Sequence, residues 1–385
     1  MKYYIVAGEA SGDLHGSNLM KGLYKEDPEA QMRFWGGPMM DAVFKANEQG
    51  EGLVEDYRSG AVMGVVEVLR KAPALLKRVS RCKADIAAWK PDVVVLIDYP
   101  GFNFKIAEFA HNAGFKVYYY IPPKLWATRE GRIKKLKAWV DKLFIVFPFE
   151  KPFFDHHAMP YVYAGNPLVD AIEGSPALSE TRETFLQRTG LPDTRLIVLL
   201  AGSRSMEIGA MMPVFMELAD RWHAAHPGDV FVVAAAPARS MQDYEKYIGP
   251  RGGYVKVVFG ETYGALRHAR AAVINSGTAS LEAALIGTPQ VVGYRMNPLT
   301  AAIAKRLIKV KYISLGNLIL DRLAFRELWQ DGFTAPRLME EVSRLTEDEP
   351  YRNRMQADYA EIRSLLGGSG ASEAVARAMI ESLRK

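Results

Sequence analysis

Short apolar runs recur along the chain, and segments long enough to form helices separate them. The runs form two series. The first series comprises residues 3–7, 93–97, 117–121, 142–147 and 161–164, and the second comprises residues 196–201, 230–236, 255–259, 271–274 and 290–294. Nearly continuous apolar strands that alternate with helices are typical of parallel sheets covered by helices on both faces. The pattern therefore predicts an α/β protein with two Rossmann-like, doubly wound domains.

A segment with linker composition separates the two series. It spans residues 172–180 and reads Ile-Glu-Gly-Ser-Pro-Ala-Leu-Ser-Glu. After residue 321 the pattern is helical to the end of the chain, with breaks at 348–350 and 367–370. We therefore expect a first domain over residues 1–170, a second over 171–348 and C-terminal helices over 349–385. Two such domains place ligands in a cleft between them, at the carboxyl ends of their strands.

The composition narrows the class of protein. A chain of 385 residues is too long for one ordinary core, and 49% hydrophobic with 24% charged residues is typical of a folded protein. The net charge of +5 suits anionic ligands or an anionic membrane surface, and no basic tract indicates nucleic-acid binding. The single cysteine, Cys82, excludes an intramolecular disulfide framework and a cysteine metal cluster, and it fits a reducing compartment.

No segment approaches the roughly 20 apolar residues that span a bilayer, and the apolar run near the start is too short for a signal peptide. The sequence therefore predicts a cytosolic protein.

Residues 61–79 have the pattern of a helix that lies on a membrane surface. An apolar stripe, kinked near Pro73, is flanked by basic residues that an anionic leaflet would attract. The alternative is that the stripe packs under the first sheet. We assign the membrane contact to Val62, Val66 and Leu69. The stripe also contains Val65, Leu76 and Val79, and the basic residues are Arg70, Lys71, Lys77 and Arg78.

The segment over residues 270–289 combines a strand, a turn of small residues and a helix. In the turn, Ser276, Gly277 and Thr278 bring backbone N–H groups to a helix N-terminus, which favours a phosphate. Glu282, one helical turn later, is placed to accept hydrogen bonds from the two hydroxyls of a ribose. The pattern indicates a nucleotide site. The alternative is an ordinary capped helix with a solvated Glu282.

A second phosphate-binding pattern follows the strand at 196–201. Gly202 and Ser203 supply backbone donors, and Arg204 offers a fork suited to bidentate phosphate binding. The alternative is a surface ion pair between Arg204 and Glu207.

Carboxylates follow two strands of the first series. Glu9 and Asp13 come after the first strand, where their charges would repel a pyrophosphate and instead suit sugar hydroxyls or a general base. Asp98 ends a wholly apolar strand, so partial burial would raise its pKa toward that of a useful base. The alternatives are that Asp13 and Asp98 cap the helices that follow them.

Other catalytic patterns are missing from the sequence. The adjacent pair His156 and His157 points to different faces, and no metal-ligand spacing occurs elsewhere. The chain also lacks a P-loop motif and the nucleophile elbow of α/β-hydrolases. We therefore expect no metal and no cofactor.

Seven motifs, in this order and spacing, resemble the lipid-A-disaccharide synthase family of inverting glycosyltransferases, and the resemblance covers nearly the whole chain. The motifs are residues 7–13 (Ala-Gly-Glu-Ala-Ser-Gly-Asp), 97–103 (Ile-Asp-Tyr-Pro-Gly-Phe-Asn), 147–150 (Phe-Pro-Phe-Glu), 202–204 (Gly-Ser-Arg), 275–278 (Asn-Ser-Gly-Thr) with Glu282, 292–296 (Val-Gly-Tyr-Arg-Met) and 314–317 (Ser-Leu-Gly-Asn). The resemblance implies a GT-B fold, with the nucleotide in the C-terminal domain and the acceptor in the N-terminal one.

The implied reaction transfers 2,3-diacylglucosamine from UDP to the 6-hydroxyl of 2,3-diacylglucosamine 1-phosphate (lipid X). Such a transfer needs a base for the hydroxyl, which we assign to Asp98, with Asp13 and Glu9 as competing candidates. It also needs positive stabilisation of the departing diphosphate, which we assign to Arg204 and residues 276–278. The resemblance also implies that Asn317 lies near the nucleotide.

The chain departs from the family's usual residues at several positions. In a loop that keeps Trp126 and Arg129, Lys124 and Thr128 replace a serine and a tryptophan, which bears on acceptor details such as acyl-chain identity. The other departures are Ala201, Asn166 in place of histidine, and Gly316 in place of proline.

The main alternative is a UDP-sugar 2-epimerase of the same architecture, and a nonenzymatic nucleotide-sugar binding protein is a third. An apolar surface that receives acyl chains distinguishes the two enzymes, because an epimerase does not need one, and its presence would favour the synthase. We expect a synthase to lie on the inner face of the cytoplasmic membrane. The resemblance also implies that the protein could form a homodimer in which the two chains exchange their C-terminal parts. Residues 318–329 are amphipathic, and the break at 348–350 could serve as the hinge for such an exchange. In the monomeric alternative, the last helix packs back on the first domain.

Overall fold

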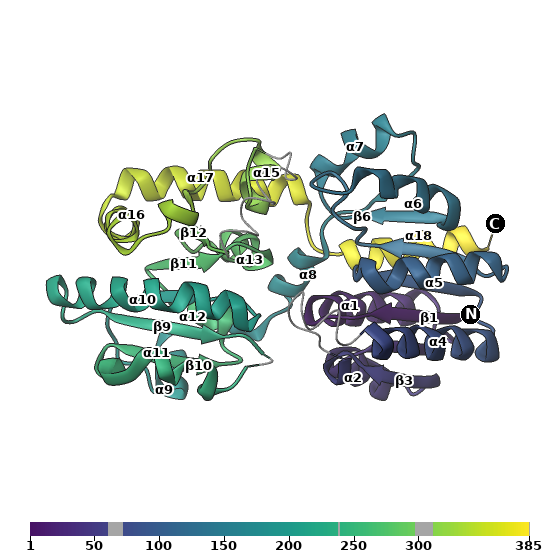
Figure 1. Cartoon of the computed structure of the whole chain (residues 1–385), viewed down its shortest axis with the longest axis horizontal. Coiled ribbons are helices and arrows are strands. Elements are labelled where there is room, and N and C mark those ends of the chain that lie inside the picture. Colours follow the sequence, from purple (N-terminus) through teal and green to yellow (C-terminus); the bar gives the residue numbers. More distant parts are fainter. Residues whose placement is uncertain (61–71, 238, 297–310, 385) are drawn as a thin grey trace. The chain divides into compact units, whose positions relative to one another are not determined.

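The computed structural model describes residues 1–60, 72–237, 239–296 and 311–384, and the chain forms two compact units (Figure 1). The first unit comprises Met1–Ala171 and Leu366–Lys385, and the second comprises Ile172–Leu365. The chain passes between the units within α8 (Pro167–Glu173) and again at the end of α17 (Glu349–Leu366). Each unit is an α/β fold built on a parallel sheet, as the pattern predicted.

The sheet of the first unit has the strand order β3-β2-β1-β4-β5-β6-β7, and all its pairings are parallel. Its strands are β1 (Lys2–Ala7), β2 (Gln31–Gly36), β3 (Gly50–Asp56), β4 (Val93–Ile97), β5 (Lys116–Tyr120), β6 (Lys142–Ile145) and β7 (Val162–Tyr163). Its other helices are α1 (Ala10–Glu26), α2 (Pro38–Asn47), α4 (Ala72–Trp89), α5 (Pro100–Asn112), α6 (Ile133–Trp139), α7 (Lys151–His156) and α18 (Ala371–Leu383).

The apolar strands form because both faces of this sheet are covered. Successive residues alternate between two core layers: Tyr4 and Val6 belong to the layer that includes Cys82 and Phe102, and their neighbour Ile5 belongs to the other. A strand buried on both faces reads as a continuous apolar run, which is why its sequence signal is strong.

Two strands of this sheet lie in segments that we expected to be helical. They are β2 and β3, and that prediction was wrong. The polar residues at these outer positions weaken the apolar signal: Arg33 in β2 pairs with Asp85 of α4, and β3 carries charged residues along an edge. Strands near a sheet edge need no continuous apolar run.

The sheet of the second unit has the order β10-β9-β8-β11-β12-β13, again with parallel pairings. Its strands are β8 (Leu196–Leu200), β9 (Val230–Ala235), β10 (Val255–Phe259), β11 (Ala271–Asn275), β12 (Gln290–Tyr294) and β13 (Glu327–Trp329). Its other helices are α9 (Arg182–Thr189), α10 (Ser205–Ala225), α11 (Glu245–Ile248), α12 (Thr262–His268), α13 (Thr278–Ile286), α15 (Leu315–Leu320) and α16 (Ala335–Glu347).

The chain after residue 321 is not entirely helical, contrary to our expectation. Residues 318–329, which we considered as one amphipathic segment, divide into the end of α15, a turn and β13. The turn begins at Asp321, whose φ of 51° is left-handed and ends the helix. The break at 348–350 is a single residue, Asp348, between α16 and α17.

The last helix, α18, packs against α1 in the first unit, where both ends of the chain lie (Figure 1). The carboxylate of Asp170 holds its start by accepting the N–H groups of Gly370, Ala371 and Ser372. Arg377 of α18 also donates to Glu26 of α1 at 2.8 and 3.0 Å. This helix therefore packs on its own chain's first unit.

Candidate active site

Each sheet has one point at which the strand order reverses, and the motifs of interest follow the strands at these two points. In the first unit, β1 and β4 are neighbours, and they lead into Gly8–Glu9 and into Asp98. In the second unit, β8 and β11 are neighbours, and they lead into residues 202–204 and 276–278. Doubly wound sheets bind ligands at this point, outside the carboxyl ends of the strands.

The turn after β4 is strained. Asp98 and Tyr99 have φ angles of 46° and 47°, a left-handed conformation that costs roughly 1–2 kcal/mol per residue without glycine. The carbonyl of Asp98 is fixed by the Tyr119 hydroxyl, at 2.7 Å, and by Asn103 Nδ2, at 2.9 Å. Strain held in place by its surroundings is typical of functional positions. The structure thus sets the half-buried Asp98 rigidly at the strand end.

Tyr99 joins this turn to the loop after β1. A Cβ atom on Gly8 would lie 2.2 Å from the Tyr99 ring, so the close approach of the two loops requires glycine there. Burial raises the pKa of Tyr99, and the negative charge of Glu9 acts in the same direction, so Glu9 lies near this ring. Glu9 itself is exposed at the N-cap of α1. The structure therefore brings Glu9 and the Asp98 turn together.

Asp13 has a different set of partners. Its buried carboxylate accepts the N–H groups of Gly37 (2.9 Å), Met39 (3.0 Å) and Met40 (3.0 Å), at the start of α2. The helix it caps is therefore α2 and not the helix that contains it. Burial raises the pKa of Asp13, and the three N–H donors oppose that rise.

Glu150, which follows β6, is a buried carboxylate that our sequence analysis quoted in a motif but did not place in a site. It is 2% exposed, and it accepts the N–H groups of Val146 and Phe147 and, at 3.3 Å, the indole N–H of Trp126. Burial raises its pKa to about 7. The bonds from Val146 and Phe147 are local and place Glu150 at the third position of a capped turn, whereas the contact with Trp126 comes from a distant loop that local sequence does not show.

In the second unit, α13 begins without a side-chain cap. Its N-cap, Gly277, is exposed and has an extended φ of 171°, and a Cβ there would meet nothing closer than 4.0 Å. The first-turn amides of a helix have no partner within the helix, and the helix dipole favours an anion beside them. The Ser276 N–H donates to the Gly293 carbonyl at 2.9 Å, so the open anion-binding site lies at the amides of Gly277 and Thr278.

Glu282 of α13 is half-buried and accepts a hydrogen bond from the Tyr263 hydroxyl at 3.1 Å. It is therefore not the solvated side chain of our alternative. Burial raises its pKa. Tyr263, in α12, was not identified from the sequence, because the contact joins two successive helices on either side of β11 and local periodicity does not show which of their side chains meet.

The loop after β8 differs from this pattern. Glu207 accepts the N–H groups of Ser203 and Arg204, at 3.0 and 3.1 Å, so a carboxylate of the chain caps the start of α10. The Arg204 side chain is 60% exposed and pairs with Glu207 at 3.1 Å, as our alternative proposed. Arg239, which the sequence analysis missed, holds the loop by donating to the Ser203 carbonyl at 2.6 and 2.8 Å.

Among the described residues, no group of three or more His, Cys, Asp or Glu side chains has an arrangement that could hold a metal ion. The described part of the chain also has no helix that is long and apolar enough to cross a membrane.

A family model described as lipid-A-disaccharide synthetase matches residues 3–379. The chain belongs to this family. It is 39% identical over 382 residues to the lipid-A-disaccharide synthase of Geobacter metallireducens, covering 99% of this chain and 97% of the relative. It is 38% identical over 350 residues to the enzyme of the same name from Pseudomonas fluorescens Pf-5, covering 90% of each.

Solved structures with a similar fold include two UDP-GlcNAc 2-epimerases. The Neisseria meningitidis enzyme, solved with UDP-GlcNAc, has a TM-score of 0.72 at 15% identity and covers 99% of this chain and 100% of its own. The Methanocaldococcus jannaschii enzyme, solved with UDP-GlcNAc and UDP, has a TM-score of 0.69 at 13% identity, with the same coverage. At this identity the likeness shows the fold alone, which is that of GT-B glycosyltransferases and these epimerases.

Asn317, which the resemblance to lipid-A-disaccharide synthases placed near the nucleotide, is fully buried and bound to its own chain. Its Nδ2 donates to the Phe325 carbonyl (3.0 Å) and to Glu327 (2.8 Å), and its Oδ1 accepts the N–H groups of Ala324 (2.8 Å) and Phe325 (3.3 Å). These bonds hold the turn that leads into β13.

The departures from the usual lipid-A-disaccharide synthase residues have local packing roles or lie on the surface. Asn166 donates to the Val146 carbonyl and accepts the Leu168 N–H at the start of α8, each at 2.9 Å. A Cβ at Gly316 would lie 2.8 Å from the Phe325 ring. Lys124 and Thr128 are exposed in the Trp126 loop.

Proposed function

We propose that this chain transfers 2,3-diacylglucosamine from UDP to the 6-hydroxyl of 2,3-diacylglucosamine 1-phosphate, forms a β-1,6-linked disaccharide 1-phosphate and releases UDP. The observation that carries the proposal is the match to lipid-A-disaccharide synthases over nearly the full length. The positions of the motifs at the reversal points of both sheets support it, because such points bind ligands in doubly wound folds.

We propose that Asp98 is the general base that takes the proton from the acceptor's 6-hydroxyl. In an inverting transfer, the 6-oxygen attacks the sugar's anomeric carbon while a base takes its proton and the UDP oxygen departs. The rigid turn after β4 supports Asp98 for this role, because a base must be held at hydrogen-bond distance from the proton it accepts. Glu9 remains a candidate base beside it. The carboxylate of Asp13 is held by three amides, which favours a supporting role in placing α2.

For the donor, we assign the diphosphate to the turn at residues 276–278, through the amides of Gly277 and Thr278, and to the charge of Arg204, with Ser203 beside it. Glu282 accepts hydrogen bonds from the ribose hydroxyls, and Tyr263 orients it. Amides at a helix N-terminus and an arginine stabilise the charge that develops on the leaving diphosphate without a metal. Asn317 acts through the turn that it holds.

We also propose that the protein docks on the inner face of the cytoplasmic membrane. The residues assigned to this contact, Val62, Val66 and Leu69, lie outside the described residues. Two apolar residues of the stripe lie in the described part of the chain, and they differ in burial. Val79 is buried in the core, whereas Leu76 is 55% exposed. An exposed leucine beside the exposed Lys77 at the start of α4 supports a landing surface in the part of the stripe before residue 79.

The reaction is tested by incubating the purified protein with the UDP-linked diacyl donor and the 1-phosphate acceptor and detecting the products by mass spectrometry. We expect a disaccharide 1-phosphate and UDP in equal amounts, and no UDP release when the acceptor is omitted. Isomerised or hydrolysed UDP-sugar in the absence of acceptor would instead indicate an epimerase.

A further inference from the structure

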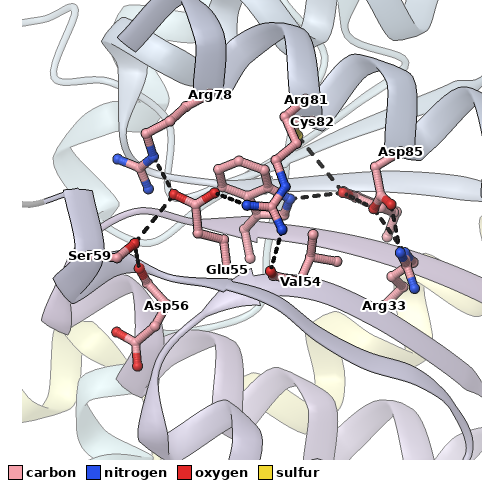
Figure 2. A network of polar contacts seen from close by, with 11 residues as sticks. Arg33, Val54, Glu55, Asp56, Ser59, Arg78, Arg81, Cys82 and Asp85 are labelled. Atoms are coloured by element: carbon pink, nitrogen blue, oxygen red, sulfur yellow. Dashed lines mark hydrogen bonds and ion pairs between the residues drawn. The ribbon is translucent and has the colours of Figure 1, made fainter. Parts of the chain in front are cut away.

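An open cavity of about 590 Å³, lined mainly by charged residues, lies where β3 ends beside α4, outside the site described above. Its polar lining residues come from three elements: the end of β3, the turn that follows it and the first half of α4 (Figure 2). They are Glu55, Asp56, Ser59, Lys77, Arg78 and Arg81. Because β3 is parallel to β1 and β4, its carboxyl end lies at the same edge of the sheet as Glu9 and Asp98.

Positive charge predominates in this lining. Glu55 is shared by two guanidinium groups: its Oε1 lies 2.5 Å from Arg78 Nε, and its Oε2 lies 3.2 Å from Arg81 Nη1. Asp56, the other carboxylate, pairs at 2.6 Å with Arg58, which is not part of the lining. One carboxylate cannot neutralise two arginines and Lys77, so the cavity favours an anion.

Arg78 ties the cavity to the turn that carries Asp98. Its side chain is 17% exposed, and its guanidinium carbon lies 5.5 Å from the centre of the Trp35 ring. Although burial raises the pKa of Tyr99, the charge of Arg78 is the largest influence that lowers it, so this guanidinium lies close to the tyrosine next to Asp98. Arg78 therefore belongs to the cavity lining and also lies close to Tyr99, the residue that follows Asp98.

We propose that this cavity binds the 1-phosphate of the sugar acceptor, an inference that rests on the proposed function. A phosphate monoester carries nearly two negative charges and accepts paired hydrogen bonds from guanidinium forks. The acceptor carries its 6-hydroxyl and its 1-phosphate on one sugar ring, so the two groups must be bound near each other. Asp98 precedes Tyr99 in the chain, and Arg78 lies close to the Tyr99 side chain, which agrees with this requirement. Glu55 contacts one nitrogen of each guanidinium, Arg78 Nε and Arg81 Nη1, and we assign the phosphate to the N–H groups on their other nitrogens.

The test compares two acceptors, the diacylglucosamine with its 1-phosphate and the same sugar without it. Arg81→Gln is the first variant, because the Arg81 side chain is 61% exposed and its loss leaves the core intact. We expect kcat/KM for the phosphorylated acceptor to fall about 10-fold, and about 100-fold in the Lys77→Gln/Arg81→Gln double variant. For the acceptor without phosphate, kcat/KM should change less than about threefold.

Arg33→Gln is the matched control. Arg33 belongs to the same network in Figure 2 and pairs with Asp85 of α4 at 2.6 Å, but it does not line the cavity. Its substitution should leave the preference between the two acceptors unchanged. If Arg81→Gln lowers activity equally for both acceptors, or leaves the preference intact, the phosphate assignment is wrong.

A binding measurement separates this proposal from the proposed function. Calorimetry with each acceptor in detergent micelles reports phosphate recognition without turnover. A protein that makes no disaccharide contradicts the proposed function. In that case, weaker binding of the phosphorylated acceptor to Arg81→Gln still supports the cavity, and unchanged binding overturns it.

Discussion

The loops that follow β1 and β4 in the first unit differ in chemistry from those that follow β8 and β11 in the second, although the strand order around them is the same. The first unit presents the carboxylates Glu9 and Asp98. The second presents the start of α13, which has no side-chain cap, and Arg204 in the loop that follows β8. In our proposal, the shared strand order places both pairs of loops at the carboxyl edge of their sheets, and their side chains suit a hydroxyl in the first unit and a phosphate in the second.

A further contrast lies within the second unit. The start of α10 is capped by Glu207, whereas the start of α13 has no side-chain cap. Both helices follow central strands, but a carboxylate already on the amides competes with a phosphate. We therefore propose that the diphosphate binds chiefly at α13, whereas the sequence analysis assigned it to both loops.

Asp98→Asn tests the first unit and should have the largest effect. The amide keeps the shape of the side chain but cannot accept the proton, so we expect kcat to fall about 10²- to 10⁴-fold. UDP affinity, measured by calorimetry, should not change, because we assign Asp98 to the acceptor and the binding of UDP to the second unit. Glu9→Gln is the parallel variant. If it loses more activity than Asp98→Asn, Glu9 is the base.

Gly277→Ala tests the second unit. The extended φ and the open space at this position predict a normally folded variant, but a methyl group there would stand between the α13 amides and a diphosphate. We expect UDP affinity to fall about 10- to 100-fold, as charge-assisted hydrogen bonds are lost. Gly228→Ala is the control, because a Cβ there also meets nothing within 4 Å and the residue lies before β9. Equal UDP affinity in the two variants would exclude the α13 site.

Arg204→Ala separates a phosphate ligand from a surface ion pair. If Arg204 binds the diphosphate, UDP affinity should fall roughly 10-fold or more. The melting temperature should change little in either case, because an exposed ion pair contributes at most about 1 kcal/mol. Arg221→Ala is the matched control, since Arg221 also lies on α10 and pairs with Glu217. Unchanged UDP affinity would contradict the diphosphate assignment of Arg204 and favour the surface ion pair with Glu207.

Glu150→Gln tests the raised pKa of the buried Glu150 carboxylate through the pH dependence of protein stability. The folded-state pKa of about 7 exceeds the ordinary 4.5, so between these values the folded protein binds more protons than the unfolded one. The contribution of Glu150 to stability therefore decreases as the pH rises through this window, by up to about 3 kcal/mol. We expect the melting temperature to fall less in Glu150→Gln than in the wild type between pH 5 and pH 8. Parallel pH profiles would contradict the raised pKa.

The apolar periodicity by itself determined the central strands and their helices. Strands such as β4 and β11 are buried on both faces, so burial appears directly as a continuous apolar run in the local sequence. The residues that follow these strands could also be read locally, because a parallel strand delivers the next residue to the carboxyl edge of the sheet. Glu9, Asp98 and Gly277 were predicted as site residues in this way.

Only the tertiary structure decided which polar groups those residues meet. Asp13 caps α2, Asn317 holds the turn before β13, and Glu207 occupies the amides at the start of α10. The outer strands β2, β3 and β13 also escaped the pattern, because strands near a sheet edge carry polar residues whose partners lie elsewhere in the chain. A hydrogen bond depends on where two distant segments come to lie, and local periodicity carries no information about that.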